Sequence, residues 1–553
     1  MSGKPQDSSA RPDQNEPSTP ATRLGSLLEA LWILLLVAPA ATTASVTRIF
    51  DSNQSALFIV SCWLVVATRL LFVRRSFFVA TLPIAVAGVL CMGADFLRGA
   101  DPLALVLQWR TYSRVDVAGA VRPYIGLALC GCVALAALSW ACWRTSRSIA
   151  TRRPVQLGLF AGTVVLAVAV PGTTWLRAWP VDGILVVASA ITNSRLMAQY
   201  LFPASSTIDP RNPNATWKAS RVAGAPKAET VVFIVGETIR NDYLKECHGP
   251  ERVRAVASGA LVACDVTSGS DTTDTSVPLM ISRELPGHAV RVSDDATFLR
   301  AFQETGFETW WISAQAPSIA WADARRSVFP GHKGLDTDVL LPPLATALAG
   351  PAALKALVLH ANNAHDPYCV RYDQARAPYP ASCVDVSVAP NRDNLRDVRL
   401  NYANAVDSSI GFVNDVIAQL EHRPEPAFLV FSPDHAENLL DDSREIWGHA
   451  RRDPTQWDTH VPAIFWANDV WRATHAVEWA HLRSQIDAPL MHVDLVPTLL
   501  SAAGIRYEER RTLPVDLLTQ AVPPRGRIVQ HALNATVPWQ TLVDEARAAS
   551  SPP

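Results

Sequence analysis

Five apolar segments fill much of the first 175 residues, and they limit the folds open to this chain more than any other feature. Each segment is close to the ~20 residues with which a helix crosses the hydrocarbon core of a bilayer. The segments are Leu27–Ala44, Ala56–Val73, Phe77–Phe96, Tyr124–Trp143 and Val155–Trp175. We therefore expect residues 23–176 to form a transmembrane domain of five helices.

Basic residues indicate the orientation of these helices. Arg74-Arg75 and the run from Arg144 to Arg153 fall on the same side if all five segments span. The positive-inside rule then places both in the cytoplasm, with the polar, Pro-rich residues 1–22, which we expect to be a disordered tail. Arg69 lies near the cytoplasmic end of the second segment, where its side chain can snorkel to the interface. Everything after Trp175 is then exported.

The exported part has a different pattern, in which short apolar runs alternate with helical stretches. We expect an interfacial helix and linker over residues 177–228, a folded domain over 229–540 and a tail over 541–553. The strand candidates are Thr230–Val235, Phe307–Ile312, Leu354–Leu359, Ala427–Phe431 and Val461–Trp466, and helical candidates include Asp295–Glu304, Asn401–His422 and His492–Ala503. This alternation predicts an α/β domain with a mostly parallel sheet, whose ligands bind beyond the carboxyl ends of the strands.

Charge and cysteine usage exclude other classes. A net charge of −2, with no basic run that contains interleaved aromatic residues, gives no support for nucleic-acid binding. No CxxC pattern is present, so a thiolate metal site is not expected. Four of the nine cysteines lie in the exported part, where an oxidising environment favours disulfides. The simplest pairing is Cys247–Cys264 with Cys369–Cys383, although the sequence leaves the connectivity open.

Potential metal ligands follow three of the predicted strands. Glu237 follows the first strand, His360 and His365 follow the third, and Asp434 and His435 follow the fourth. A single Glu at a strand end is usually a cap or a surface charge. Several imidazoles and carboxylates at the same sheet edge instead form the nitrogen and oxygen ligand set that suits Zn²⁺.

A hydroxyl-rich stretch, Thr267–Arg283, has the features of a loop that turns into a helix. It contains Ser276-Val277-Pro278, and Pro fits the first helical turn because the missing N–H has no partner there. A hydroxyl at such a helix start lies among unpaired amides and the positive dipole end, where a phosphate is favoured. A Ser/Thr-rich surface loop is the alternative interpretation of this stretch taken alone.

Five motifs together resemble the phosphoethanolamine transferases of the alkaline phosphatase superfamily, over about residues 27–505. They are Val235-Gly236-Glu237-Thr238 with Arg240, Thr267–Ser282, His360 to Pro367, Pro433-Asp434-His435-Ala436-Glu437, and Tyr402 to Asp407. The segment from His492 to Leu500 is similar to a helix found more widely in sulfatase-like proteins.

The resemblance implies a role for each matching residue. Thr273 is implied to be the nucleophile, with Thr272 and Thr275 as the alternatives. The implied ligands of a catalytic Zn²⁺ are Glu237, Thr273, Asp434 and His435. His365 matches a histidine that contacts substrate or a second metal. His449 is the nearest counterpart of another such histidine, at a spacing that differs from the family pattern.

The resemblance also implies a reaction and its partners. Thr273 takes phosphoethanolamine from phosphatidylethanolamine as a covalent intermediate and passes it to lipopolysaccharide, in the core or lipid A, or to another envelope glycan. The implied protein is a monomer in the bacterial inner membrane, multi-pass, with its catalytic domain in the periplasm. Trp311 to Gln315 replaces a stretch typical of lipid A-directed members, which favours core heptose or periplasmic glucan as the acceptor.

Departures from the family pattern keep other functions open. Gly269 and Leu279 stand where family members often have cysteines, and Ala436 replaces a common Gly. A phosphoglycerol transferase would keep the same zinc and threonine chemistry. A sulfatase-like hydrolase needs Cys or Ser followed by x-Pro-x-Arg, and here Met280 occupies the Arg position. A catalytically inactive sensor or scaffold would not need the full ligand set.

Overall fold

The structure is a computed structural model in which the chain forms two compact units, Met1–Gly93 with Gly126–Asn193 and Ala94–Ile125 with Ser194–Pro553. Each unit is described by itself. The structure describes residues 20–46, 60–65, 67, 69, 75–98, 125–145, 158, 161, 216–222, 228–287, 296–315, 324–330, 334–362, 364–383, 390–450, 454–509, 511–530 and 536–550.

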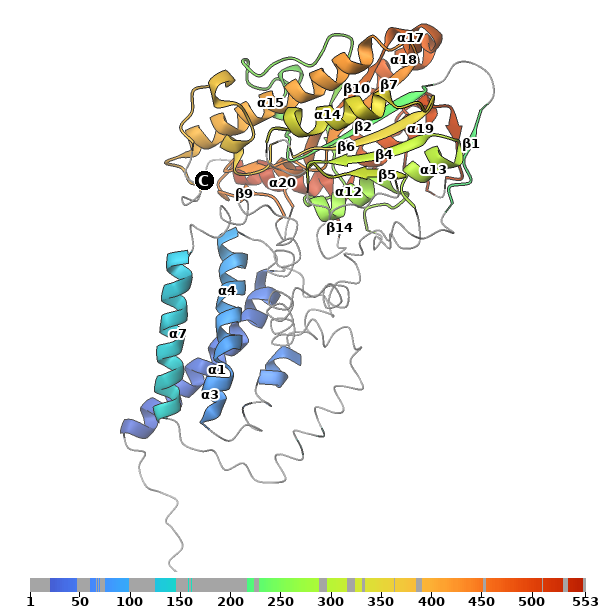
Figure 1. Ribbon diagram of the computed structural model, residues 1–553. Coiled ribbons are helices and arrows are strands. Elements are labelled where there is room, and N and C mark those ends of the chain that lie inside the picture. Colours follow the sequence, from blue (N-terminus) through green and yellow to red (C-terminus); the bar gives the residue numbers. More distant parts are fainter. Residues whose placement is uncertain are drawn as a thin grey trace, which may run out of the picture. The chain divides into compact units, whose positions relative to one another are not determined.

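Helices occupy three of the five predicted spans (Figure 1). These helices are α1 (Pro20–Val46) in the first span, α3 (Ser76–Ala80) and α4 (Leu82–Arg98) in the third, and α7 (Ile125–Thr145) in the fourth. The described residues of the second span are helical, and most of the fifth span, the interfacial helix and the N-terminal tail lie outside the described residues. Among the described residues one helix, Gly126–Thr145, is long and apolar enough to cross a membrane. An α-helical unit is therefore confirmed, but a count of five spanning helices is not.

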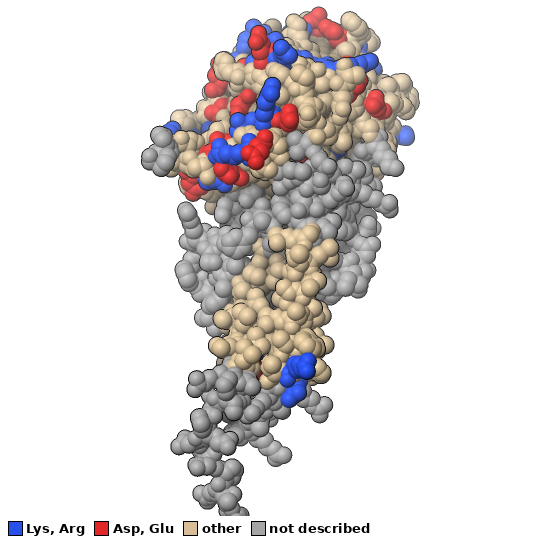
Figure 2. Space-filling model, turned by 90° about the vertical axis from the view of Figure 1, so that its left-hand side faces the viewer, with Lys and Arg blue, Asp and Glu red and all other residues tan. Residues whose placement is uncertain are grey.

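The described surface of the first unit is apolar. Leu127, Leu129 and Val133 of α7 and Leu27 of α1 are all more than half exposed. Figure 2 shows this surface almost free of Asp and Glu, with basic side chains gathered at one end. An exposed apolar area of this kind suits contact with lipid.

Arg69 does not snorkel to the surface as expected. Its guanidinium is 3% exposed and forms an ion pair with Glu29 of α1, at 2.5 Å between Nη2 and Oε1. The same guanidinium carbon lies 5.2 Å from the ring centre of Phe77 and 5.5 Å from that of Phe78. The expected snorkelling is replaced by this ion pair because a carboxylate on α1, only 17% exposed, compensates the buried charge directly.

The second unit is an α/β domain built on an eight-stranded sheet, with strand order β11-β3-β10-β7-β2-β6-β4-β5 (Figure 1). The strands are β2 (Thr230–Gly236), β3 (Leu261–Thr267), β4 (Glu308–Ser313), β5 (Arg326–Val328), β6 (Lys355–His360), β7 (Ala427–Pro433), β10 (His460–Ala467) and β11 (Leu490–Met491). Strand β10 pairs antiparallel with β3 and β7, and the other pairings are parallel. The mostly parallel sheet is confirmed, with one reversed strand.

The sheet is buried on both faces, because successive strand residues point to opposite sides. In β2, Val231 and Phe233 belong to one apolar cluster, and Val232 and Ile234 belong to the other. The covering helices are α12 (Thr273–Ile281), α13 (Leu299–Glu304) and α19 (Leu495–Ala502) beside the first cluster, and α14 (Asp336–Ala349) and α15 (Leu395–Glu421) beside the second. Short helices α17 (Asp469–Thr474) and α18 (Ala476–Gln485) follow β10.

The folded domain extends beyond the predicted boundaries at both ends. Within the predicted linker, β1 (Ser220–Arg221) pairs with β12 (Ile505–Arg506), and the Trp217 side chain is fully buried. At the other end, α20 (Trp539–Ser550) begins two residues before the predicted tail and continues through most of it, and it follows the hairpin of β13 (Ile528–Gln530) and β14 (Thr536–Pro538). Local polarity suggested a linker and a tail, but Trp217 in the first segment, and Leu542 and Ala546 in the second, are buried.

Two disulfides connect the predicted cysteine pairs. Cys247 bonds to Cys264, and Cys369 bonds to Cys383, each with a Cα–Cα distance of 5.5 Å. The first connects a short 3₁₀ helix, η3 (Lys245–Cys247), to β3. The simplest pairing from the sequence is therefore the one in the structure.

Candidate active site

The candidate site lies where the carboxyl ends of the parallel strands meet. Glu237 follows β2, Asp434 follows β7, and Thr273 begins α12 just after β3. Gln315 follows β4, and His365 follows β6. The topology therefore collects at one sheet edge residues that are far apart in the sequence.

Thr273 is oriented into this cluster. Its Oγ1 is 3.2 Å from His435 Nε2 and 3.3 Å from Glu237 Oε2. Thr272 precedes it in an extended conformation at the helix N-cap and is 3% exposed. The hydroxyl of Thr273 therefore lies beside the open amides of the first turn of α12 and beside two potential metal ligands.

Glu237 is held by a hydrogen bond to each carboxylate oxygen. Thr238 Oγ1 donates to Oε1 at 2.6 Å, and Gln315 Nε2 donates to Oε2 at 2.6 Å. Thr238 adopts a left-handed conformation, with φ of 59°, which is rare for a β-branched residue. The Tyr402 hydroxyl donates to Thr238 O at 2.7 Å and accepts from Arg240 N at 2.9 Å. This arrangement keeps the chain turned so that Glu237 points into the site.

Asp434 and His435 are both fully buried, and the backbone sets their orientation. His435 N donates to Asp434 Oδ1 at 2.8 Å, and His435 Nδ1 is 2.9 Å from Ala436 O. A proton on Nδ1 satisfies that carbonyl, and Nε2 faces Thr273 and Glu237. Among the described residues Asp434 Oδ2 has no hydrogen-bond donor, and it lies 3.5 Å from His435 Nε2.

Two further histidines complete the cluster. His449 follows the hairpin of β8 (Asn438–Leu439) and β9 (Trp447–Gly448), and its ring centre is 4.2 Å from that of His435 and 5.4 Å from that of His365. Its Nδ1 is 3.1 Å from Glu437 Oε1. The sequence had singled out Glu437 as part of a motif but had given it no role.

The charges of the cluster are strongly coupled. Burial raises the pKa of Glu237, but the positive potential of His435, His365 and His449 outweighs it and lowers the pKa. Burial and the charge of Glu237 raise the pKa of Asp434. Burial lowers the pKa of His435, and Asp434 with Glu237 more than reverses this, raising it to about 9. The carboxylates therefore create a strong attraction for a cation at this point.

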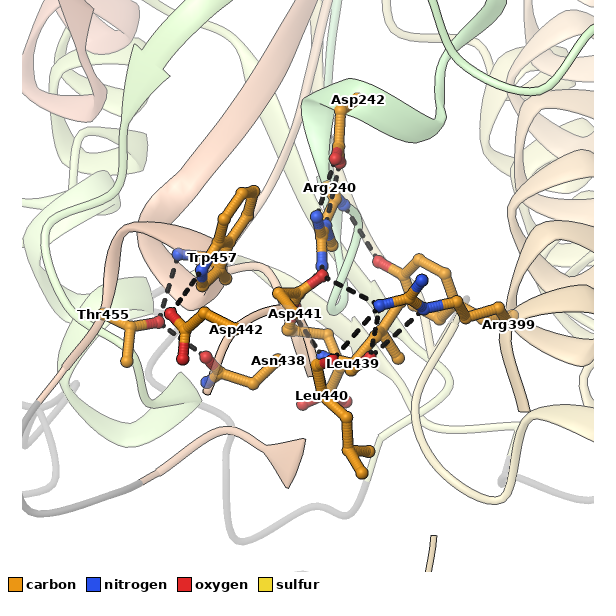
Figure 3. A network of polar contacts seen from close by, with 12 residues as sticks. Arg240, Asp242, Arg399, Asn438, Leu439, Leu440, Asp441, Asp442, Thr455 and Trp457 are labelled. Carbon is orange, nitrogen blue, oxygen red and sulfur yellow. Dashed lines mark hydrogen bonds and ion pairs between the residues drawn. The ribbon is translucent and has the colours of Figure 1, made fainter. Parts of the chain in front are cut away.

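A salt-bridge network beside the site anchors the hairpin that precedes His449 (Figure 3). Arg240 is 3% exposed, with Nη2 2.6 Å from Asp242 and Nη1 2.7 Å from Asp441. Its guanidinium also lies 4.8 Å from the ring centre of Trp457. Asp441 in turn accepts from Leu439 N at 2.8 Å. The end of β2, which positions Glu237, is thereby connected to the hairpin that positions His449.

The residues present fit a metal ion such as Zn²⁺. Glu237, His435 and His449 each offer a ligand atom, and these atoms lie within 4.8 Å of one another. Among the described residues the buried Asp434 Oδ2 has no donor, so it is a further group that a cation would satisfy. His449 thus lies within reach of this group, and the resemblance had matched it to a histidine that contacts substrate or a second metal.

All six residues implied by the resemblance lie at this sheet edge: Glu237, Thr273, His365, Asp434, His435 and His449. The contact of Gln315 with Glu237 was not foreseen. The sequence had pointed to Gln315 only as the last residue of the Trp311 to Gln315 stretch, which ends two residues after β4.

A sheet of this topology with this ligand set defines the class of protein. The family model described as Sulfatase matches residues 229–505, half of the chain, and the chain belongs to this family. The expected kinship with phosphoethanolamine transferases of the alkaline phosphatase superfamily is also confirmed, because curated relatives have that name.

The curated relatives match only part of their own length. Putative transferase YhbX of Escherichia coli is 27% identical over 258 residues, 44% of this chain and 44% of that protein. Phosphoethanolamine transferase EptC of Escherichia coli is 23% identical over 228 residues, 38% of each chain. The chain therefore matches less than half the length of these relatives.

Solved structures show the same fold. The integral membrane lipooligosaccharide phosphoethanolamine transferase A of Neisseria meningitidis has a TM-score of 0.59 at 17% identity, covering 90% of this chain and 99% of that chain. The zinc complex of the periplasmic domain of Escherichia coli EptC has a TM-score of 0.53 at 17% identity, covering 61% of this chain and 99% of that one.

Proposed function

We propose that the chain is a membrane-embedded, zinc-dependent phosphoethanolamine transferase with Thr273 as its nucleophile. The proposed catalytic domain, residues 229–540 extended by α20, is periplasmic, and the protein belongs to the bacterial inner membrane. The observation that carries this proposal is the position of Thr273 Oγ1, 3.3 Å from Glu237 and 3.2 Å from His435. A hydroxyl at a helix start among several potential metal ligands suits a nucleophile for phosphoryl transfer.

Zn²⁺ held by Glu237, Asp434, His435 and Thr273 would lower the pKa of the threonine hydroxyl and polarise the phosphoryl group. The open amides at the start of α12 favour the negative charge of the incoming phosphodiester. Glu237, fixed by Thr238 and Gln315, keeps its carboxylate beside the nucleophile without reorganisation.

The reaction consists of two displacements at phosphorus. In the first, Thr273 Oγ1 bonds to phosphorus, the bond to the glycerol oxygen breaks, and diacylglycerol leaves with a proton. In the second, an acceptor oxygen bonds to phosphorus and loses its proton as Thr273 is released and reprotonated. His365 and His449, with rings 5.4 Å apart beside the cluster, are the groups placed to move these protons.

Both proposed substrates agree with properties of the chain. A lipid donor requires an enzyme at a bilayer, which agrees with the spanning length of α7 and the apolar surface of the first unit. The matched relatives are named phosphoethanolamine transferases. The acceptor is a sugar of lipopolysaccharide or another envelope glycan, and the Trp311 to Gln315 stretch favours core heptose or glucan over lipid A.

A transfer assay with the full chain in phosphatidylethanolamine vesicles tests the proposal. Release of diacylglycerol in the presence of an envelope glycolipid extract is expected for the native chain and for Thr275→Ala. Thr273→Ala should lose at least ~10³-fold in rate while keeping its membrane insertion and melting temperature. Retained activity in Thr273→Ala would reject Thr273 as the nucleophile. In vesicles that contain both phosphatidylethanolamine and phosphatidylglycerol, transfer of phosphoglycerol rather than phosphoethanolamine would reject the proposed donor.

Zinc dependence is tested in the same assay. Prolonged chelation should abolish diacylglycerol release, and stoichiometric Zn²⁺ should restore it, because the nucleophile depends on the cation. Activity that survives chelation, in protein shown by elemental analysis to hold no metal, would contradict the proposed role of zinc.

A further inference from the structure

His492 is a buried imidazole outside the ligand cluster that contacts the segments carrying it. It opens the 3₁₀ helix η7 (His492–Asp494), directly before α19, and is 1% exposed. No metal or substrate role follows from its position, because the nitrogens of its ring lie against protein groups. The His492 ring contacts the loop before Thr273, the first turn of α12 and the end of β7.

The two ring nitrogens reach different parts of the site. Nδ1 is 3.4 Å from the backbone N of Gly269, in the loop that leads to Thr273. Nε2 is 3.2 Å from Ser432 Oγ, two residues before Asp434 on β7. The imidazole therefore lies between the nucleophile loop and the strand that positions Asp434 and His435.

The hydrogen bonds of the neighbouring groups determine which ring nitrogen of His492 carries the proton. Ser276 Oγ donates to Asp434 O at 2.5 Å, so its proton is not available to His492. Ser432 Oγ donates to Pro462 O at 2.9 Å, so it accepts from His492 Nε2–H. Nδ1 is then the acceptor for Gly269 N–H. One neutral tautomer satisfies every group, and burial, which lowers the pKa of His492 to about 3, keeps the ring in that state.

We propose that His492 is a positioning residue, which sets the distance between the Thr273 loop and the Asp434–His435 strand end by accepting from Gly269 and donating to Ser432. A rigid ring has a fixed separation between its two nitrogens, so it acts as a spacer as well as a hydrogen-bond partner. Ser276 provides a parallel, direct connection from α12 to Asp434 O. Both connections are buried, where polar networks are geometrically specific.

This inference rests on the proposed function only in that Thr273, Asp434 and His435 must act together at one ion. A displacement of about 1 Å between a nucleophile and its partners costs about 10²-fold in rate. Outer residues that orient metal ligands typically change metal affinity or activity by about 10–100-fold when they are lost. We expect effects of that size when the ring of His492 is removed.

The matched control is His475, at the junction of α17 and α18. It is 3% exposed, stacks on Trp471 with ring centres 4.4 Å apart, and contacts Trp471 O through Nδ1 at 3.1 Å. It is thus another buried histidine, and the contacts that it makes with described residues lie outside the site. His475→Leu should lower the melting temperature while leaving zinc affinity and kcat within about twofold of the native chain.

The experiment compares His492→Leu, His492→Asn and His475→Leu in the full chain, by Zn²⁺ titration, by steady-state kinetics and by melting temperature. His492→Leu should lose about 10–100-fold in zinc affinity and in kcat, with KM for the donor within about twofold. His492→Asn places an amide oxygen where Nδ1 was, so its zinc affinity and kcat should each be at least about threefold higher than those of His492→Leu.

Equal zinc affinity in His492→Leu and His475→Leu at matched melting temperatures would overturn the proposal. So would His492→Asn being no better than His492→Leu. If His492→Leu does not fold, His492→Asn is compared with His492→Gln, which keeps a donor near the position of Nε2 but has no acceptor at the position of Nδ1. The proposal then requires that the His492→Asn protein binds zinc more tightly than the His492→Gln protein. The titration uses Zn²⁺ alone and needs no substrate. If the native chain showed no transferase activity but the variants still differed in zinc affinity as expected, the proposed function would be rejected and the positioning role of His492 would stand.

Discussion

At the scale of single residues, the site depends on groups that hold the ligands as much as on the ligands. Glu237 has a hydrogen-bond donor on each oxygen, and one of these donors is Gln315. The Gln315 amide also donates to Ala361 O at 3.1 Å, so its own orientation is fixed. A ligand carboxylate held in this way needs little reorganisation to accept a cation.

Replacing Gln315 with Leu should weaken zinc binding by about 10–100-fold, because Glu237 loses the donor that orients Oε2. Isothermal titration of the purified chain with Zn²⁺ measures this. Gln303→Leu is the control, since Gln303 is half-buried on α13 and donates to Thr309 Oγ1 at 2.9 Å, away from the cluster. Equal affinities for the two variants would show that Gln315 does not orient Glu237.

At the scale of elements, the buried Arg240 network joins the end of β2 to the β8–β9 hairpin (Figure 3). A buried guanidinium with two carboxylate partners gains little over an apolar core, but removing it leaves Asp441, which is 10% exposed, with only the more distant Arg399, at 3.8 Å, as a cationic partner among the described residues. The hairpin also contains Leu440 and Glu445 at positive φ, 53° and 50°, which tertiary contacts must maintain.

We therefore expect Arg240→Met to lower the free energy of unfolding by about 3–5 kcal/mol, as measured by chemical denaturation. Arg392→Met removes an exposed ion pair with Glu445, whose partners are 57% and 53% exposed. That control should change the free energy of unfolding by less than about 1 kcal/mol. A small effect at Arg240 would mean that the hairpin is held by other contacts.

Asp265 on β3 forms ion pairs with Arg527, the residue before β13, and with His460, the first residue of β10. Burial raises the pKa of Asp265, but the hydrogen bonds with His460 and Arg527 outweigh it and lower the pKa. A lowered carboxyl pKa stabilises the fold above the unfolded pKa, and this contribution disappears as the pH falls through the folded pKa.

The difference in unfolding free energy between the native chain and Asp265→Asn should therefore be largest near neutral pH and shrink as the pH falls below about 4. Denaturant titrations of both proteins across this range give the difference directly. A difference that stays constant with pH would mean that the charge of Asp265 contributes nothing.

The central strands could be predicted from the sequence because parallel strands buried on both faces are continuous apolar runs. Strand β3, LVACDVT, was not predicted, since a cysteine and an aspartate interrupt its apolar pattern. The direction of β10 could not be predicted either, because an apolar run has the same appearance in both directions. The candidate metal ligands could be proposed from their positions after the strands, whereas the roles of Gln315 and His492 depend on contacts that only the folded chain creates.

At the scale of the whole molecule, we propose that the apolar helical unit and the α/β domain both serve one lipid-dependent reaction. The central claim is that Thr273 carries the transferred group. Its most direct test is mass spectrometry of the peptide containing Thr273, after the zinc-loaded full chain is quenched during turnover with phosphatidylethanolamine. We predict phosphoethanolamine esterified to Thr273, and none after chelation. Continuing transfer with an unmodified Thr273, or with the group on another residue, would contradict the account.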